Sequence, residues 1–183
     1  MRLGTKVSSF FIERSFMTRI EDLVNENTYY MIDIDGVCID TEERICALAA
    51  IYGWKDVFDI VNWHEHIYSS KQIRGSLDIL KEVQTRLKRI QLLTQNHSKE
   101  EEYEKISFFR QNGIYIPIVS VPAKISKSTI IPPSFYNGNV VLVDDREKNI
   151  IDWSKNGGIA LHFTEEETPY QRVKTLEFLK HVK

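Results

Sequence analysis

The 183-residue chain has little cysteine, no excess of either charge and no long apolar run, and each absence excludes a class of protein. Its two cysteines, Cys38 and Cys46, are too few for a disulfide scaffold or a zinc site. The 24 basic and 26 acidic side chains give a formal net charge of −2, whereas a general binder of nucleic acid needs a basic excess. The longest uncharged stretch, Ser128 to Val143, contains Pro132 and Pro133, and it does not match the roughly 20 apolar residues of a membrane span.

What is present describes an ordinary globular protein. Hydrophobic residues make up 42% of the chain and charged residues 27%, as in folded domains. The apolar cluster from Phe10 to Ile12 is too short for a secretory signal. We therefore expect a cytoplasmic protein with no stable nucleic-acid binding and no membrane association. Composition leaves the oligomeric state open.

Short apolar runs, each followed by a polar residue, recur along the chain. Continuous runs of this kind are typical of strands that are buried on both faces of a parallel sheet. The runs are Tyr29–Ile32, Ile90–Leu93, Ile116–Val121, Val140–Val143 and Ile159–Phe163.

Helical patterns lie between these runs. Ser76–Arg89 carries an apolar stripe, Ser98 begins a helix that ends at Asn112, and Thr168 begins a last helix. Strands that alternate with helices predict a three-layer, Rossmann-like α/β fold. Ligands of such folds bind at the carboxyl ends of the strands.

One connection is too long for this alternation. The segment from Asp35 to Thr94 is about twice the length of a simple crossover of roughly 30 residues. We predict a small helical cap at residues 40–73, with a first helix at Thr41–Tyr52 and a second at Trp54–Tyr68. Residues 29–39 and 74–183 then form the core, and residues 1–28 are an N-terminal extension.

Carboxylates gather at two predicted strand ends. Asp33 and Asp35 lie two residues apart after the first apolar run, and Asp144 and Asp145 follow the fourth. If these strands are neighbours, the four carboxylates suit a hard divalent cation, most plausibly Mg²⁺. Thr94 and a lysine would add a hydroxyl and a positive charge, and the whole set suits a phosphoryl group.

Each element has a simpler explanation when taken alone. An Asp-x-Asp-Gly sequence also occurs in turns, although the closing Glu of a calcium loop is absent. Asp144 or Thr94 could each be a helix cap. The order of all four elements, each after an apolar run, favours the functional interpretation.

From Tyr30 to about Phe163, the order and the residues of these motifs resemble those of the haloacid-dehalogenase-like (HAD) phosphatases. Within that superfamily the chain is most similar to the 5′(3′)-deoxyribonucleotidase branch. The matching motifs are Met31–Val37, Leu92–Thr94 and Val141–Asp145, and the branch is indicated by Asp33–Asp40, Tyr103–Lys105, Val143–Arg146, Trp153 and Gly157–Gly158.

The resemblance implies a role for each residue of the site. Asp33 would be the nucleophile and Asp35 the general acid and base. Thr94 would bind the phosphoryl oxygens. Mg²⁺ would be held by Asp33, the Asp35 backbone carbonyl, Asp144 and Asp145.

The phosphate-binding lysine has two candidates. Lys124 has the strand-to-lysine spacing of the branch and is preferred, whereas Lys127 lies in a similar local sequence. Gln95, Arg146 and Lys127 are further candidates for substrate contacts. Gln95 stands where the nucleotidases usually have a second hydroxyl.

The predicted function is that of a Mg²⁺-dependent phosphomonoesterase acting on (deoxy)nucleoside monophosphates. Sugar phosphates, other small phosphate esters and nucleic-acid 3′ ends remain alternatives. A catalytically silent binding protein of the same fold is an alternative of another class. A receiver-like phosphoacceptor domain is disfavoured, because it needs neither the Asp144–Asp145 pair nor the insertion.

Several other residues have structural explanations that we prefer. His64 and His66 lie two apart on a predicted helix and cannot point the same way, so a metal site there is disfavoured. The cap aromatics, including Trp54, Phe58 and Trp63, could stack on a base but more simply pack the insertion.

Overall fold

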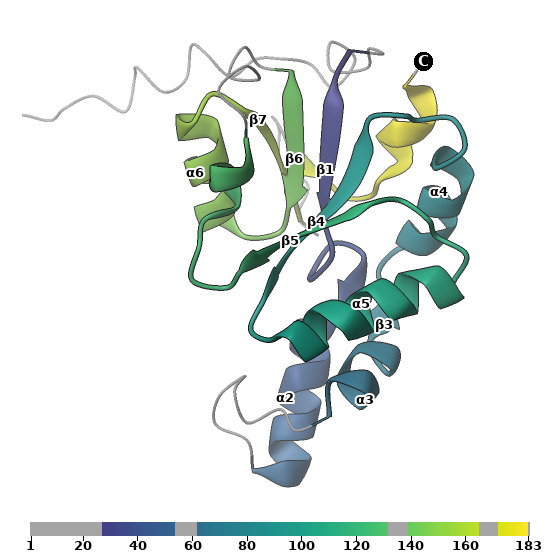
Figure 1. The fold of residues 1–183 in the computed structure, drawn as a ribbon, viewed down its shortest axis with the longest axis vertical. Helices are drawn as coiled ribbons and strands as arrows, with labels where there is room; N and C mark the ends of the chain where they lie inside the picture. Colours follow the sequence, from purple (N-terminus) through teal and green to yellow (C-terminus); the bar gives the residue numbers. More distant parts are fainter. Residues whose placement is uncertain (1–26, 54–61, 132–138, 165–171, 183) are drawn as a thin grey trace, which may run out of the picture.

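The computed structural model describes residues 27–53, 62–131, 139–164 and 172–182, and contains a parallel sheet of six strands (Figure 1). The strand order is β5-β4-β1-β6-β7-β8, and every neighbouring pair is parallel. The strands are β1 (Tyr29–Asp33), β4 (Ile90–Asn96), β5 (Ile118–Pro122), β6 (Val140–Asp144), β7 (Ile159–Phe163) and β8 (Arg172–Val173). This architecture confirms the predicted α/β fold.

Helices and a small second sheet connect these strands. A two-stranded antiparallel ribbon joins β2 to β3 where the cap leaves and rejoins the core. The remaining elements are β2 (Ile39–Asp40), α2 (Thr41–Tyr52), α3 (Trp63–Tyr68), β3 (Lys71–Gln72), α4 (Ser76–Val83), α5 (Lys99–Gln111), the 3₁₀ helix η3 (Lys127–Ile130), α6 (Glu147–Lys155) and the 3₁₀ helix η5 (Glu177–His181).

Two apolar clusters fill the spaces between the sheet and its helices. Ile32 and Val143 face a cluster that includes Leu80 of α4 and Phe109 of α5. Leu142, the neighbour of Val143, faces the other cluster with Trp153 of α6. Successive residues of one strand therefore face opposite helical layers, so the sheet is the middle layer of a three-layered domain. In Figure 1, α6 and α4 accordingly lie on opposite sides of the strands.

The helix boundaries follow local signals in the sequence. The Asp40 side chain accepts a hydrogen bond from the Glu43 N–H at the start of α2, and Gly53 ends that helix with a φ of 72°. At the start of α5, Ser98 accepts from the Glu101 N–H. These ends confirm the predicted boundaries of both helices. The α4 helix is shorter than predicted and ends at Val83.

The cap helices lie at the end of the molecule opposite the C-terminus in Figure 1. Helix α3 packs against α5 and α2. Trp54 and Phe58 lie outside the described residues, so the predicted second helix is seen only as α3. The exact division into core, cap and extension stays a prediction.

The predicted C-terminal helix is wrong in its described part. Arg172–Val173 extends the sheet beside β7, and only Glu177–His181 is helical, as a 3₁₀ turn. A 3₁₀ turn still buries two apolar residues three apart, which is why Leu176 and Leu179 produced a helix-like pattern. Within the described ranges, no helix is long and apolar enough to cross a membrane.

Candidate active site

Three central strands bring the predicted residues to one edge of the sheet. Strand β1 lies between β4 and β6, with Asp33 in register with Leu93 and Ile32 in register with Val143. Asp33 ends β1, Thr94 lies in β4 and Asp144 ends β6. The parallel arrangement therefore places these side chains together, as the sequence predicts.

Asp33 is buried and oriented by two groups. Its Oδ1 accepts a hydrogen bond from the Ile34 N–H at 2.8 Å, and its Oδ2 lies 2.6 Å from Nζ of Lys127. Burial and the charge of Asp144 raise the pKa of Asp33 well above its usual value, although Lys127 acts against them. One carboxylate oxygen is thus fixed by the backbone and the other by a cation that an incoming anion could share.

The structure places Lys127, and not Lys124, beside the carboxylates at the strand ends. Lys127 is 3% exposed, and its Nζ lies 2.7 Å from Oδ2 of Asp144 as well as beside Asp33. Lys124 is exposed, on the wall of a neighbouring cavity. The turn after β5 continues into η3, and this extra length brings Lys127 back over the sheet edge. Burial opposes its charge, but the two carboxylates raise the pKa of Lys127.

Asp35 is held by a different set of donors. Its Oδ1 accepts from Thr41 Oγ1 at 3.0 Å, and its Oδ2 accepts from Thr94 Oγ1 at 3.0 Å and from Lys105 Nζ at 2.7 Å. Burial acts to raise the pKa of Asp35, but the ammonium of Lys105 outweighs it and lowers that pKa. The two aspartates, two residues apart, therefore have opposite pKa shifts.

Lys105 is a site residue that the sequence reasoning did not identify. It is 1% exposed and contacts Thr94 Oγ1 at 2.9 Å, Asn96 Oδ1 at 3.0 Å and Glu101 Oε1 at 2.7 Å. The available signal was its position in α5, four residues after Glu101 and on the face that carries Phe108 and Phe109. A lysine on the buried face of a helix needs a carboxylate partner, because an unpaired buried charge is costly.

Asp144 and Asp145 complete a three-carboxylate cluster with Asp33. One oxygen from each lies within 4.8 Å of the others. Asp145 Oδ1 is buried and has no hydrogen-bond partner among the described residues. Burial and the charge of Asp144 raise the pKa of Asp145 to about 6. A hard divalent cation would supply the missing partner, so these residues fit the implied metal.

Gly36 makes room for this cluster. It has a φ of 73°, and a Cβ at this position would lie 2.0 Å from Asp145 Oδ2. The glycine after Asp35 is therefore needed both for the left-handed turn and for the close approach of Asp145.

A small cavity opens over Asp33 and Asp35. Its volume is about 100 Å³, roughly that of three water molecules. The cap contributes Ile45, Trp63 and His66 to its wall. A phosphoryl group fits this space, whereas a larger leaving group has to extend outside it.

The two cap histidines have different environments. Among the described residues, neither belongs to a group of side chains close enough to hold a metal ion. His64 is exposed and stacks on Tyr68, with ring centroids 4.1 Å apart. His66 is 1% exposed, and burial lowers its pKa to about 4. Its Nδ1 has no hydrogen-bond partner among the described residues. Trp63 packs in a stacked arrangement near His97 and is itself buried, as the packing interpretation predicts.

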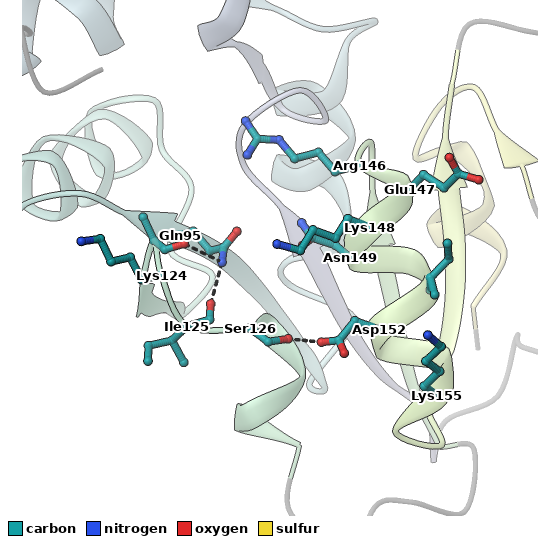
Figure 2. Close-up of a pocket in the computed structure, with 12 residues that line it drawn as sticks. Gln95, Lys124, Ile125, Ser126, Arg146, Glu147, Lys148, Asn149, Asp152 and Lys155 are labelled. Atoms are coloured by element: carbon teal, nitrogen blue, oxygen red, sulfur yellow. Dashed lines mark hydrogen bonds between the residues drawn. The ribbon is translucent and has the colours of Figure 1, made fainter. Parts of the chain in front are cut away.

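A larger cavity of about 700 Å³ shares lining residues with the small one. Figure 2 shows the residues that line the larger cavity. Both cavities are lined by Gln95, Ala123, Arg146 and Asn149. Gln95 donates to the Ile125 carbonyl at 2.6 Å and so fixes the loop after β5. The predicted substrate residues Gln95 and Arg146 thus line the boundary between the two cavities, and Lys124 lines the outer one.

Comparisons with known proteins give the fold but no specific relative. No family model matches the chain, and no curated protein matches its sequence. A HAD-superfamily hydrolase from Ehrlichia chaffeensis superposes with a TM-score of 0.53 at 11% identity, over 84% of this chain and 96% of that one. A haloacid-dehalogenase-like family protein from Streptococcus pneumoniae superposes with a TM-score of 0.52 at 10% identity, over 86% and 91%. The chain therefore has the fold of HAD-superfamily hydrolases, with a cluster of acidic residues at the strand ends.

Proposed function

We propose that this chain is a Mg²⁺-dependent phosphomonoesterase that acts through a phosphoaspartate on Asp33. The observation that carries the proposal is the contrast between the two aspartates after β1. Asp33 lies beside Lys127 and the acidic cluster, whereas Asp35 is held apart by Thr41, Thr94 and Lys105. This contrast supports the assignment of Asp33 as the nucleophile and of Asp35 as the proton donor and acceptor.

In the first step an oxygen of Asp33 attacks phosphorus and the bond to the ester oxygen breaks. Asp35 passes a proton, taken up from the monoanionic phosphate ester, to the departing oxygen, which leaves as an alcohol. Lys127, already 2.6 Å from the nucleophile, would neutralise charge on the phosphoryl oxygens. Thr94 would contribute a hydroxyl donor to the phosphoryl oxygens.

In the second step water attacks the phosphorus of the phosphoaspartate. Asp35, now a carboxylate, takes the proton from that water, and the bond from phosphorus to Asp33 breaks. The products are inorganic phosphate and the original Asp33 carboxylate. Lys105 favours the ionised Asp35 that this step needs.

Asp33, Asp144 and Asp145 are the residues that would hold Mg²⁺. The bound ion would supply positive charge at the transferring phosphoryl group. It would also provide the partner that buried Asp145 Oδ1 otherwise lacks.

For the substrate we propose a nucleoside monophosphate, deoxy rather than ribo. Its support is the resemblance of Asp33–Asp40 and of the Arg146 and Trp153 context to the deoxyribonucleotidases. A nucleoside is also small enough to occupy the cavity of about 700 Å³ beside the phosphoryl site.

The test is hydrolysis of p-nitrophenyl phosphate with and without Mg²⁺, followed by a substrate panel. Asp33→Asn should abolish turnover, whereas Asp78→Asn on the exposed surface of α4 should not. The panel compares kcat/KM for deoxynucleoside and ribonucleoside monophosphates, sugar phosphates and a 3′-phosphorylated oligonucleotide. Full activity of Asp33→Asn would refute the nucleophile. Equal kcat/KM across the panel would refute the nucleotide preference but not the chemistry.

A further inference from the structure

The leaving group of a substrate must extend into the larger cavity. The catalytic cavity of about 100 Å³ holds a phosphoryl group and little more. Arg146 and Asn149 line both cavities, so a molecule bound at Asp33 can pass directly into the larger space. The chemistry of the outer walls therefore indicates what the leaving group carries.

Those walls are cationic in a chain whose formal net charge is −2. Two acidic side chains also line the cavity, Glu147 and Asp152. Within the part of the chain that the structure describes, no ion pair neutralises the four cations. These cations are Lys124, Arg146, Lys148 and Lys155.

Neither acidic side chain cancels this charge completely. Glu147 points to the far side of α6 in Figure 2. Asp152 faces the cavity loop but accepts hydrogen bonds from the hydroxyls of Ser126 and Ser128. Its carboxylate keeps its negative charge and lies near Lys148 and Lys155. Four cations against two acidic side chains still leave the cavity wall with a net charge of +2.

Two apolar side chains are exposed among these charges. Ile125 is 44% exposed and Ile151 is 46% exposed, and both line the cavity. They offer contact area for the ring or chain that links two anionic ends of one molecule. Cations beside exposed apolar side chains suit an organic anion better than a free inorganic ion.

We infer that the outer cavity binds a second phosphoryl group on the leaving group, so that a small organic bisphosphate is bound more tightly than the matching monophosphate. This inference rests on the proposed phosphatase function and goes beyond it, because it extends the proposed monophosphate substrates to molecules with a second phosphoryl group. Lys148 and Lys155 on α6 would contact the second group, while Arg146 lies between the two anionic ends. Each lysine lost should weaken binding about fivefold, as for one unit charge near an anion in water.

The experiment compares matched substrates that differ only by the second group. The pairs are adenosine 5′-monophosphate against adenosine 3′,5′-bisphosphate, and fructose 6-phosphate against fructose 1,6-bisphosphate. We expect a higher kcat/KM for the bisphosphate of at least one pair. The advantage should shrink as ionic strength rises, because exposed charges are screened.

The variant Lys148→Gln/Lys155→Gln should reduce the bisphosphate advantage about 10- to 30-fold, through KM. Lys81→Gln/Lys88→Gln is its matched control, since it removes the same net charge from exposed lysines on and after α4. No bisphosphate advantage in either pair would overturn the inference. An equal loss in both double variants would also overturn it, because the effect would then be one of overall charge.

A binding measurement separates this inference from the proposed function. Calorimetric titration of Asp33→Asn with each bisphosphate and its monophosphate needs no turnover. Tighter bisphosphate binding that disappears in Asp33→Asn/Lys148→Gln/Lys155→Gln supports the cavity assignment even if no ester is hydrolysed. Equal binding of both members of each pair overturns it even if hydrolysis is fast. Thermal unfolding of each variant confirms that it is folded.

Discussion

The Nζ of Lys105 lies 2.7 Å from Oδ2 of Asp35 and also 2.7 Å from Oε1 of Glu101. A buried ammonium is thus shared between the proposed acid–base residue and a structural carboxylate of its own helix. Helix α5 positions Asp35 through this contact, and Thr94 joins the same network. The protonation of Asp35 is therefore tied to the packing of α5 on the sheet.

Removing this ammonium should destabilise the protein and change the titration of Asp35. Lys105→Met leaves Glu101 and Asp35 without their buried cation, and breaking such a pair costs about 3–5 kcal/mol in free energy of unfolding. The pKa of Asp35 should rise, because Lys105 is what lowers it. Urea unfolding and the carboxyl ¹³C chemical shift of Asp35 measure the two effects.

Lys99→Met is the matched control on the same helix. Lys99 is 95% exposed at its side chain and pairs with Glu102, so its loss should change stability little. A Lys105→Met protein as stable as this control would show that the buried contacts contribute nothing.

The two candidate phosphate lysines should differ strongly in their effect on turnover. Lys127→Met removes the ammonium beside Asp33 and Asp144, and we expect kcat for p-nitrophenyl phosphate to fall about 10²- to 10³-fold, as for loss of one transition-state donor. Lys124→Met should lower it threefold at most, since Lys124 is exposed on the outer cavity. A reversed order would return the role to Lys124.

The strand ends show what the sequence predicts well. Asp33, Thr94 and Asp144 each follow a short apolar run, and a parallel sheet brings such ends together whatever the rest of the fold. Helix α2 was predicted to its exact ends because Asp40 and Gly53 are strong local signals.

The remaining features depend on tertiary contacts that the local sequence does not specify. Lys124 lies in the loop that follows β5, whereas Lys127 is the first residue of η3, which returns to the edge of the sheet. The position of η3 therefore determines which lysine reaches the site. The spacing of Lys105 from Glu101 places it on the buried face of α5, but it does not show that Asp35 from another element lies beside it. At the C-terminus, pairing with β7 overrode a helical pattern.

Gly36→Ala should abolish Mg²⁺ binding in addition to destabilising the protein. The added methyl would meet Asp145 Oδ2 at 2.0 Å and displace it. The left-handed backbone adds a cost of about 1–2 kcal/mol. Gly113→Ala has the same unfavourable left-handed backbone, at a φ of 76°, but nothing lies within 4 Å of its new methyl group. Isothermal titration with Mg²⁺ should show binding in Gly113→Ala and none in Gly36→Ala, and equal binding in both would contradict the role of the glycine.

The stabilisation of the protein by Mg²⁺ should depend on pH through Asp145. Burial and the charge of Asp144 raise the pKa of Asp145 from 3.8 to about 6. Between pH 3.8 and pH 6, the metal-free folded chain therefore holds a proton that the unfolded chain has released. This carboxyl therefore favours folding below pH 3.8, and its contribution is lost as pH rises through 6. A bound cation needs the carboxylate form, so the increase in Tm caused by Mg²⁺ should be large at pH 7.5 and small at pH 5.

Asp145→Asn should remove the Mg²⁺ effect at pH 7.5 and raise the metal-free Tm there, because the uncompensated buried charge is gone. Asp78→Asn, an exposed substitution of the same type, should keep the wild-type response at both pH values. An equal Mg²⁺ shift at pH 5 and pH 7.5, or a shift that survives in Asp145→Asn, would show that the ion binds elsewhere.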